Sequence, residues 1–208
     1  MKQKGSSDFE AVKESVRGTF DRWIVKSIDI TFQATSESER NNQGGTPLAA
    51  YLLLSCAIDA IAGFYAGRTS KEGTGEQYKE FIKRYMSRYS PENMYGKLRC
   101  ALAHNFSTGE GLALTHGRSY AHNVRSLTGD VIVKNFEDVF NDFKIGLEQY
   151  FHDLDGSDDL KRNFMKRFRK FGLASAITIN YRLSANARID TSFVSASGGG
   201  FDPSKPGT

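Results

Sequence analysis

The segment from Leu48 to Ala66 restricts the fold of this chain more than any other feature. It is apolar on nearly every side and carries one charged residue, Asp59. A helix of this composition must be covered all round, either by other helices or by lipid, and about 20 such residues would span a bilayer. Ser55, Asp59 and the lack of a flanking basic cluster favour a buried helix over a membrane span. We therefore expect a central helix over residues 47–66 and no membrane contact.

Other segments have the hydrophobic spacing of amphipathic helices that could cover this central one. Apolar residues recur every three or four positions within residues 8–32, 78–89, 91–105 and 135–154. Ser90 followed by Pro91 is typical of a helix start, and Asn135 can cap the last of these helices. The polar stretch 34–45 is expected to be a loop. The predicted fold class is mainly α, a helical bundle, and 208 residues with 39% hydrophobic content suffice for one sizeable core.

Two regions alternate apolar and polar residues, as short strands do. Between Gly111 and Asn135, segments with β-branched and aromatic residues are separated by Gly117 and by a Thr-Gly-Asp turn, which predicts a small β-hairpin or meander. A second alternation over 177–193 predicts a C-terminal pair of short strands. The expected organisation is a helical domain over 1–172 with the hairpin near 111–135, a β extension over 173–194 and a mobile tail over 195–208.

Several classes of protein are excluded by what the sequence lacks. Cys56 and Cys100 stand far apart without a CxxC motif, which argues against a disulfide scaffold and a cysteine-rich zinc site. The histidines form no HExxH motif, the glycines match no nucleotide-binding loop, and no GxSxG is present. We therefore expect no metal and no cofactor. The N-terminus has no apolar segment of the signal-peptide kind, so we expect a cytoplasmic protein.

The end of the fourth predicted helix, YGKLRCALAHNFS, carries the residues expected to do chemistry. Arg99 and His104 are separated by four residues and lie about 140° apart on the half of the helix away from Leu98. A guanidinium can hold a phosphate through two hydrogen bonds, and an imidazole can relay the proton of an attacking 2′-hydroxyl. This pair suits cleavage of a phosphodiester without a metal. The route benefits from two acid/base groups, so we expect a homodimer with both His104 side chains near its two-fold axis.

Arg99 and His104, in an LRxxLAHN context at a helix end beside an apolar central helix, resemble the motif of the HEPN superfamily. In that superfamily an Arg is followed four to six residues later by a His. The resemblance implies a helical bundle that dimerises about the motif helices, with Arg99 and His104 catalytic and Asn105 supporting. Active members are metal-independent endoribonucleases used as toxins or antiviral effectors, which implies RNA and an antitoxin protein as partners. Cys100 stands where the family commonly has Asn, Asp or His, so the alternative is a non-catalytic HEPN-like binding module.

Asp59 requires a partner if it is buried, because a lone carboxylate in an apolar helix is costly. Pairing with Arg99 would orient the guanidinium and make Asp59 a supporting residue of the site. Another Arg or Lys could pair with it instead, or the carboxylate could lie at the helix surface. A purely structural all-α protein, with Arg99 and His104 as ordinary surface residues, is the remaining interpretation.

A strongly basic segment follows the DGSDD sequence at 155–159. Leu160, Phe164, Phe168 and Phe171 have nearly helical spacing within it, so an amphipathic helix with a solvated basic face is the first interpretation. The second is a nucleic-acid-binding surface, since such a face attracts phosphates by counterion release. The net charge of +4 permits an anionic partner. The basic residues concerned are Lys161, Arg162, Lys166, Arg167, Arg169 and Lys170.

Overall fold

The computed structural model describes residues 3–40, 48–70, 73–117, 122–125 and 131–172. All of them belong to one compact unit, Met1–Ser175, and the second unit, Ala176–Thr208, lies outside the described residues. The predicted C-terminal strands and tail therefore also lie outside them.

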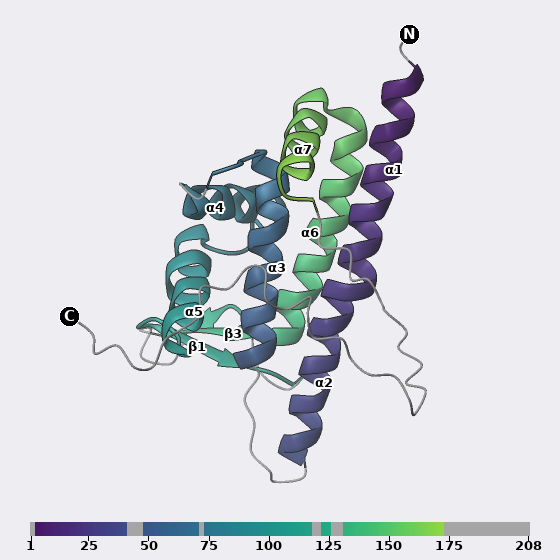
Figure 1. Ribbon diagram of the computed structural model, residues 1–208. Coiled ribbons are helices and arrows are strands. Elements are labelled where there is room, and N and C mark those ends of the chain that lie inside the picture. Colours follow the sequence, from purple (N-terminus) through teal and green to yellow (C-terminus); the bar gives the residue numbers. More distant parts are fainter. Residues whose placement is uncertain (1–2, 41–47, 71–72, 118–121, 126–130, 173–208) are drawn as a thin grey trace, which may run out of the picture. The chain divides into compact units, whose positions relative to one another are not determined.

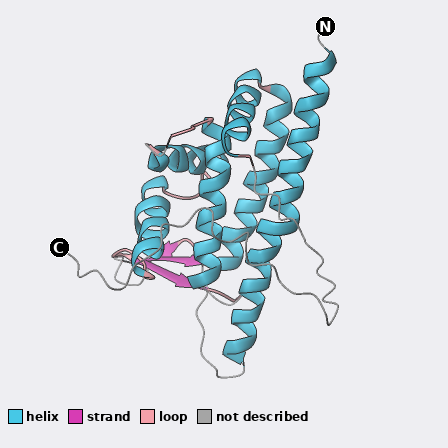
Figure 2. Cartoon of the chain, in the orientation of Figure 1, coloured by secondary structure: helices cyan, strands magenta, loops and turns pink. Residues whose placement is uncertain are grey.

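The described part of the chain is mainly helical, as predicted (Figures 1 and 2). Its helices are α1 (Gln3–Thr19), the π-helix η1 (Phe20–Val25), α2 (Lys26–Arg40), α3 (Leu48–Ala66), α4 (Thr74–Tyr85), the π-helix η2 (Asn93–Cys100), α5 (Ala101–Asn105), α6 (Phe136–Gly156) and α7 (Asp158–Phe171). The prediction of a loop from residue 34 is wrong as far as Arg40, because α2 continues to that residue. Extending an existing helix costs far less than starting one, so a polar segment rich in Glu and Ser can remain helical.

Three helix starts depend on side-chain caps that satisfy free backbone N–H groups. The Oγ of Ser90 accepts from the N–H of Asn93 at 3.3 Å, and the side chain of Asn135 accepts from the N–H of Glu137 at 3.0 Å. These two caps were predicted from the sequence. Ser157 caps α7 in the same way, through the N–H of Leu160.

A small sheet lies at one end of the helical part (Figure 2). Its strands are β1 (Leu112–Thr115), β2 (Val124–Arg125) and β3 (Ile132–Asn135), in the order β1-β3-β2. β2 pairs antiparallel with β3, but β1 pairs parallel with β3, so the expectation of a simple hairpin or meander is wrong for β1. Alternation shows which residues share a face of a strand, but it does not show which strands pair.

The helix α3 occupies the centre, as its composition predicts (Figure 1). It packs against α2, α4, α6 and α7, and its side chains Tyr51, Leu54, Ile58 and Ile61 are fully buried. The hydroxyl of Tyr51 donates to the backbone oxygen of Lys134 at 2.7 Å, which ties the sheet to the central helix. Within the described ranges, α3 is the one helix with the length and hydropathy to cross a membrane, and 56% of its apolar window is buried inside the protein.

Candidate functional site

Arg99 and Asp59 form an ion pair between the fourth predicted helix and α3. Nη2 of Arg99 donates to Oδ2 of Asp59 at 2.8 Å, and the two side chains are 26% and 19% exposed. Of the partners considered for Asp59 in the sequence analysis, the structure therefore shows Arg99. The guanidinium carbon also lies 5.8 Å from the centroid of the Tyr95 ring. Burial lowers the pKa of Arg99, but its hydrogen bonds and the charge of Asp59 outweigh this and raise it. The guanidinium is therefore charged and held in one place.

Asp59 also attracts a second guanidinium, that of Arg167 in α7. Its side chain lies against Gly63, where an added Cβ would be 2.9 Å from the guanidinium carbon. Gly63 follows Asp59 by four residues, so both lie on the same face of α3. Burial lowers the pKa of Arg167, and the charge of Asp59 partly opposes this. The charge of Asp59 therefore acts on both guanidinium groups, and the one with which it forms an ion pair is that of Arg99, at 2.8 Å.

His104 is exposed in the last turn of α5 and has no hydrogen bond or ion pair with the described residues. Asn105, predicted to support the site, is exposed as well. Phe106 then ends the helix with a left-handed backbone, φ 49°. The site thus combines a positioned guanidinium with an imidazole that is free to meet a substrate or a second copy of the chain. Arg99 lies in a π-helix, a form that often occurs at functional sites.

The six predicted nucleic-acid-binding residues of α7 do not point in one direction. Lys161 donates to the backbone oxygen of Asp155 at 3.0 Å and lies 5.7 Å from the ring centroid of Phe9. Arg167 donates to the backbone oxygen of Arg68 at 2.8 Å. Four cations remain exposed, namely Arg162, Lys166, Arg169 and Lys170.

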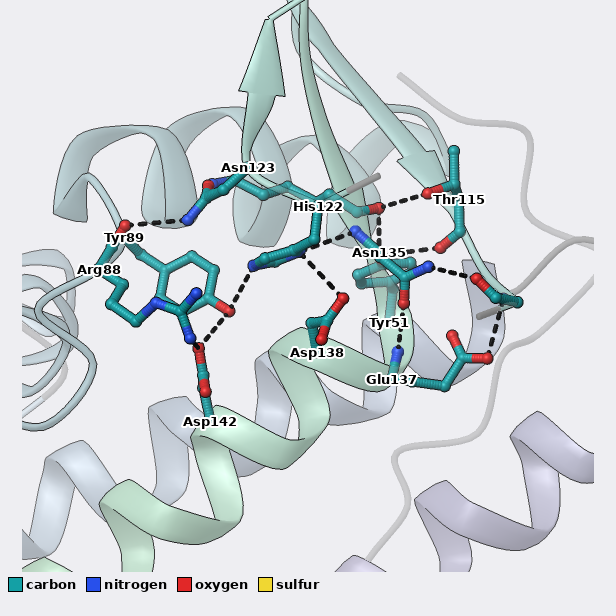
Figure 3. A network of polar contacts seen from close by, with 12 residues as sticks. Tyr51, Arg88, Tyr89, Thr115, His122, Asn123, Asn135, Glu137, Asp138 and Asp142 are labelled. Carbon is teal, nitrogen blue, oxygen red and sulfur yellow. Dashed lines mark hydrogen bonds and ion pairs between the residues drawn. The ribbon is translucent and has the colours of Figure 1, made fainter. Parts of the chain in front are cut away.

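A second polar cluster surrounds His122, where the sheet meets α6 (Figure 3). The hydroxyl of Tyr89 donates to Oδ2 of Asp142 at 2.8 Å, so it must accept from Nε2 of His122, 3.0 Å away. Nδ1 of His122 accepts from the backbone N–H of Asn135 at 3.1 Å. This pattern assigns the neutral tautomer with its proton on Nε2. The His122 side chain is only 9% exposed.

Lys134 completes this cluster from β3. Its side chain is buried, donates to Oδ1 of Asn123 and places Nζ 4.7 Å from the centroid of the Tyr89 ring. Burial lowers the pKa of Lys134 to about 8. Asn123 in turn donates to the backbone oxygen of Arg88 at 3.1 Å. The cluster therefore joins the sheet to the turn after α4 and to the start of α6, and we interpret it as structural. The residues come from distant parts of the chain, so no sequence pattern indicates it.

The neutral state of His122 predicts a loss of stability in mild acid. Burial lowers the pKa of His122, and the charge of Lys134 adds to this, although Asp138 and Asp142 oppose it. The unfolded chain takes up this proton near pH 6.5, whereas the folded chain resists it until a lower pH. The free energy of unfolding should therefore fall below about pH 6.5 more steeply in the native chain than in His122→Gln.

Urea unfolding between pH 7.5 and 5 measures this difference. His152→Gln is the matched control, because the His152 side chain is 90% exposed. It should show the native pH dependence. If the free energy of unfolding had the same pH dependence in the native chain and in His122→Gln, the folded chain would not keep His122 neutral.

The predicted site contains Arg99 with its partner Asp59, and the exposed His104. The described part of the chain contains no group of three or more His, Cys, Asp or Glu that could hold a metal ion. No family model, curated protein or solved structure matches this chain. Its function must therefore be inferred from the chemistry of its own side chains.

Proposed function

We propose that this protein is a HEPN-like, metal-independent endoribonuclease that acts through Arg99 and His104. The observation that carries the proposal is the position of the Arg99 guanidinium, whose Nη2 donates to Oδ2 of Asp59 at 2.8 Å. The exposed His104 follows at the end of the same helical segment. An ion pair with a carboxylate positions the guanidinium and leaves further N–H groups for phosphate oxygens. The apolar central helix and the position of the motif at a helix end support the likeness to HEPN domains.

The proposed reaction is an internal transfer at phosphorus. The 2′-oxygen of the ribose attacks the adjacent phosphorus and loses its proton, while the bond from phosphorus to the 5′-oxygen breaks and that oxygen gains a proton. His104 acts as the base for the first proton or the acid for the second. Arg99 stabilises the negative charge that develops on the non-bridging oxygens. The products are a 2′,3′-cyclic phosphate and a 5′-hydroxyl.

A homodimer would supply the second acid/base group, since each chain offers one His104. A suitable contact surface is an apolar groove of about 360 Å³ between α3 and the η1–α2 segment. Trp23 and Leu53 on its rim are 46% and 39% exposed. The groove also includes Cys56, whose pKa is raised by burial, with smaller effects, opposite in sign, from the charges of Arg99 and Asp59. A second copy seated in the groove would therefore lie beside the site. The groove is lined by Trp23, Ile24, Ser27, Ile28, Leu53, Cys56, Ala57 and Ala60.

Leu53→Arg is expected to convert the dimer into a monomer and to lower RNA cleavage at least tenfold. A charge buried within an apolar contact must be desolvated without a partner, which strongly opposes association. Sedimentation at micromolar concentration measures the change in mass. Ile145→Arg is the control, because Ile145 is also an exposed apolar residue, 49% accessible, but lies on α6 outside the groove. A native chain that sediments as a monomer, or a Leu53→Arg variant that remains dimeric, would argue against this interface.

The second candidate function is a HEPN-like binding module without catalysis. It is favoured by Cys100, which follows Arg99 and is a free, partly exposed thiol in place of the usual polar residue. In either case an antitoxin or other partner protein could bind the exposed helix end.

Incubating the purified chain with mixed RNA in excess chelator separates the two functions. The nuclease produces fragments that end in a 2′,3′-cyclic phosphate, whereas the binding module leaves the RNA intact.

A further inference from the structure

The exposed surface at the end of α5 contains one large apolar side chain, that of Phe106, two residues after His104. It is 68% exposed, the largest fraction among the exposed large hydrophobic residues of the described chain. Its neighbours within residues 103–107 are exposed as well, and each of them is small or polar. Within this segment the ring is therefore isolated and forms no apolar patch of the kind that marks a contact with another protein.

The backbone of Phe106 is left-handed, with φ 49° and ψ 34°. This conformation suits Gly or Asn, whereas a bulky side chain without hydrogen-bonding groups adopts it at a cost in free energy. Among the described residues, one other non-glycine position has a positive φ, and it is occupied by Asn123. The end of α5 thus keeps a phenyl ring at a position where glycine or asparagine would fit the backbone better.

Hydrogen bonds on both sides of Phe106 hold this turn in place. The N–H of Phe106 donates to the backbone oxygen of Leu102 at 3.2 Å, and the N–H of Gly109 donates to that of Lys97 at 2.8 Å. A Cβ added to Gly109 would lie 2.9 Å from the Cα of Lys97, so the two backbones are in close contact. Lys97 precedes Arg99 by two residues. The turn that carries the ring is therefore fixed against the segment that carries Arg99.

We propose that Phe106 stacks against a base beside the bond that is cleaved. The inference rests on the proposed function, because it names how the nuclease would hold its substrate. The Cα atoms of His104 and Phe106 are at most about 7 Å apart, so the imidazole and the ring can reach the same or adjacent nucleotides. Unpaired bases stack on aromatic side chains, whereas bases in a duplex are already stacked on their neighbours. The ring would therefore favour single-stranded RNA and accept any base.

The test uses single-stranded oligonucleotides with one ribonucleotide in a deoxyribose strand, which fixes the position of the cut. Two further oligonucleotides lack the base on the 5′ or the 3′ side of that cut. For one of them, kcat/KM of the native chain should fall by about 5- to 150-fold, the contribution of one stacked base. Phe106→Asn should cleave the complete oligonucleotide slower by a similar factor and lose little more when the base is missing, because both changes remove the same contact. Phe106→Tyr should behave as the native chain does.

Urea unfolding shows that the loss in Phe106→Asn does not come from a damaged fold. Asn accepts the left-handed backbone and the exposed ring buries little surface, so this variant should unfold at a urea concentration at least as high as the native chain. Phe171→Asn is the matched control, because Phe171 is 53% exposed and lies on α7. It should remain as sensitive to the missing base as the native chain.

The inference is overturned if Phe106→Asn is as sensitive to the missing base as the native chain. It is also overturned if this variant sediments with a smaller mass, because the ring would then be a contact between two copies. Binding of a labelled 2′-O-methyl single strand, measured by fluorescence anisotropy, separates the inference from the nuclease. If the chain cleaves no RNA but binds this strand at least about fivefold more tightly than Phe106→Asn does, the stacking is upheld and the nuclease is rejected. Cleavage that is independent of Phe106 does the reverse.

Discussion

Replacing His104 with alanine is expected to slow RNA cleavage by roughly 10²- to 10⁴-fold, the usual contribution of a general acid or base. The free energy of unfolding should stay within about 0.5 kcal/mol of the native value, because the side chain is exposed and contacts no described polar group. Initial cleavage rates in excess chelator, together with urea unfolding of the same preparations, measure both effects.

Two further variants make this result specific. His152→Ala removes another exposed imidazole on a helix and should cleave RNA at the native rate. Arg99→Ala should lose cleavage and also stability, because the Asp59 carboxylate would lose its ion pair in a largely buried position. Native activity in His104→Ala, or an equal loss in His152→Ala, would contradict the role given to His104.

Replacing Phe164 with alanine is expected to lower the free energy of unfolding by about 3–5 kcal/mol. Phe164 is fully buried, with its ring centroid 5.1 Å from that of Phe64 in α3 and 6.0 Å from that of Phe9 in α1. Its removal leaves a cavity where three helices meet. Urea unfolding monitored by circular dichroism measures the loss.

Phe171→Ala is the matched control on the same helix. Since Phe171 is 53% exposed, its removal should change the free energy of unfolding by less than about 1 kcal/mol. Equal losses in the two variants would mean that Phe171 anchors α7 as Phe164 does.

The helices could be predicted because their burial follows from local spacing. Apolar residues recur every three or four positions after Asn135, which predicts α6, and Asn135 itself predicts the cap of that helix. The apolar segment from Leu48 predicts the central helix α3. The π-helices could not be predicted, since a shift to i→i+5 hydrogen bonding changes the backbone without altering the apolar spacing enough to detect. The parallel pairing of β1 with β3 also could not be predicted, because it depends on tertiary contacts.

The candidate site could be predicted in part. The cost of burying Asp59 alone indicated a basic partner, and the structure shows that partner to be Arg99. The inward direction of Arg167 was not evident, because its neighbours in sequence are equally basic and only the packing of α7 on Gly63 distinguishes it. The surroundings of His122 could not be predicted either, since the groups that contact it come from separate elements.

A single ribonucleotide placed in an otherwise deoxyribose strand tests the proposed chemistry most directly. In excess chelator, the native chain should cut this oligonucleotide once, on the 3′ side of the ribose, and leave a 2′,3′-cyclic phosphate there. Arg99→Ala and His104→Ala should leave it intact, because one group stabilises the phosphorus centre and the other moves the proton. Cleavage at deoxyribose positions, or cutting that persists in both variants, would contradict a reaction through the 2′-hydroxyl at Arg99 and His104.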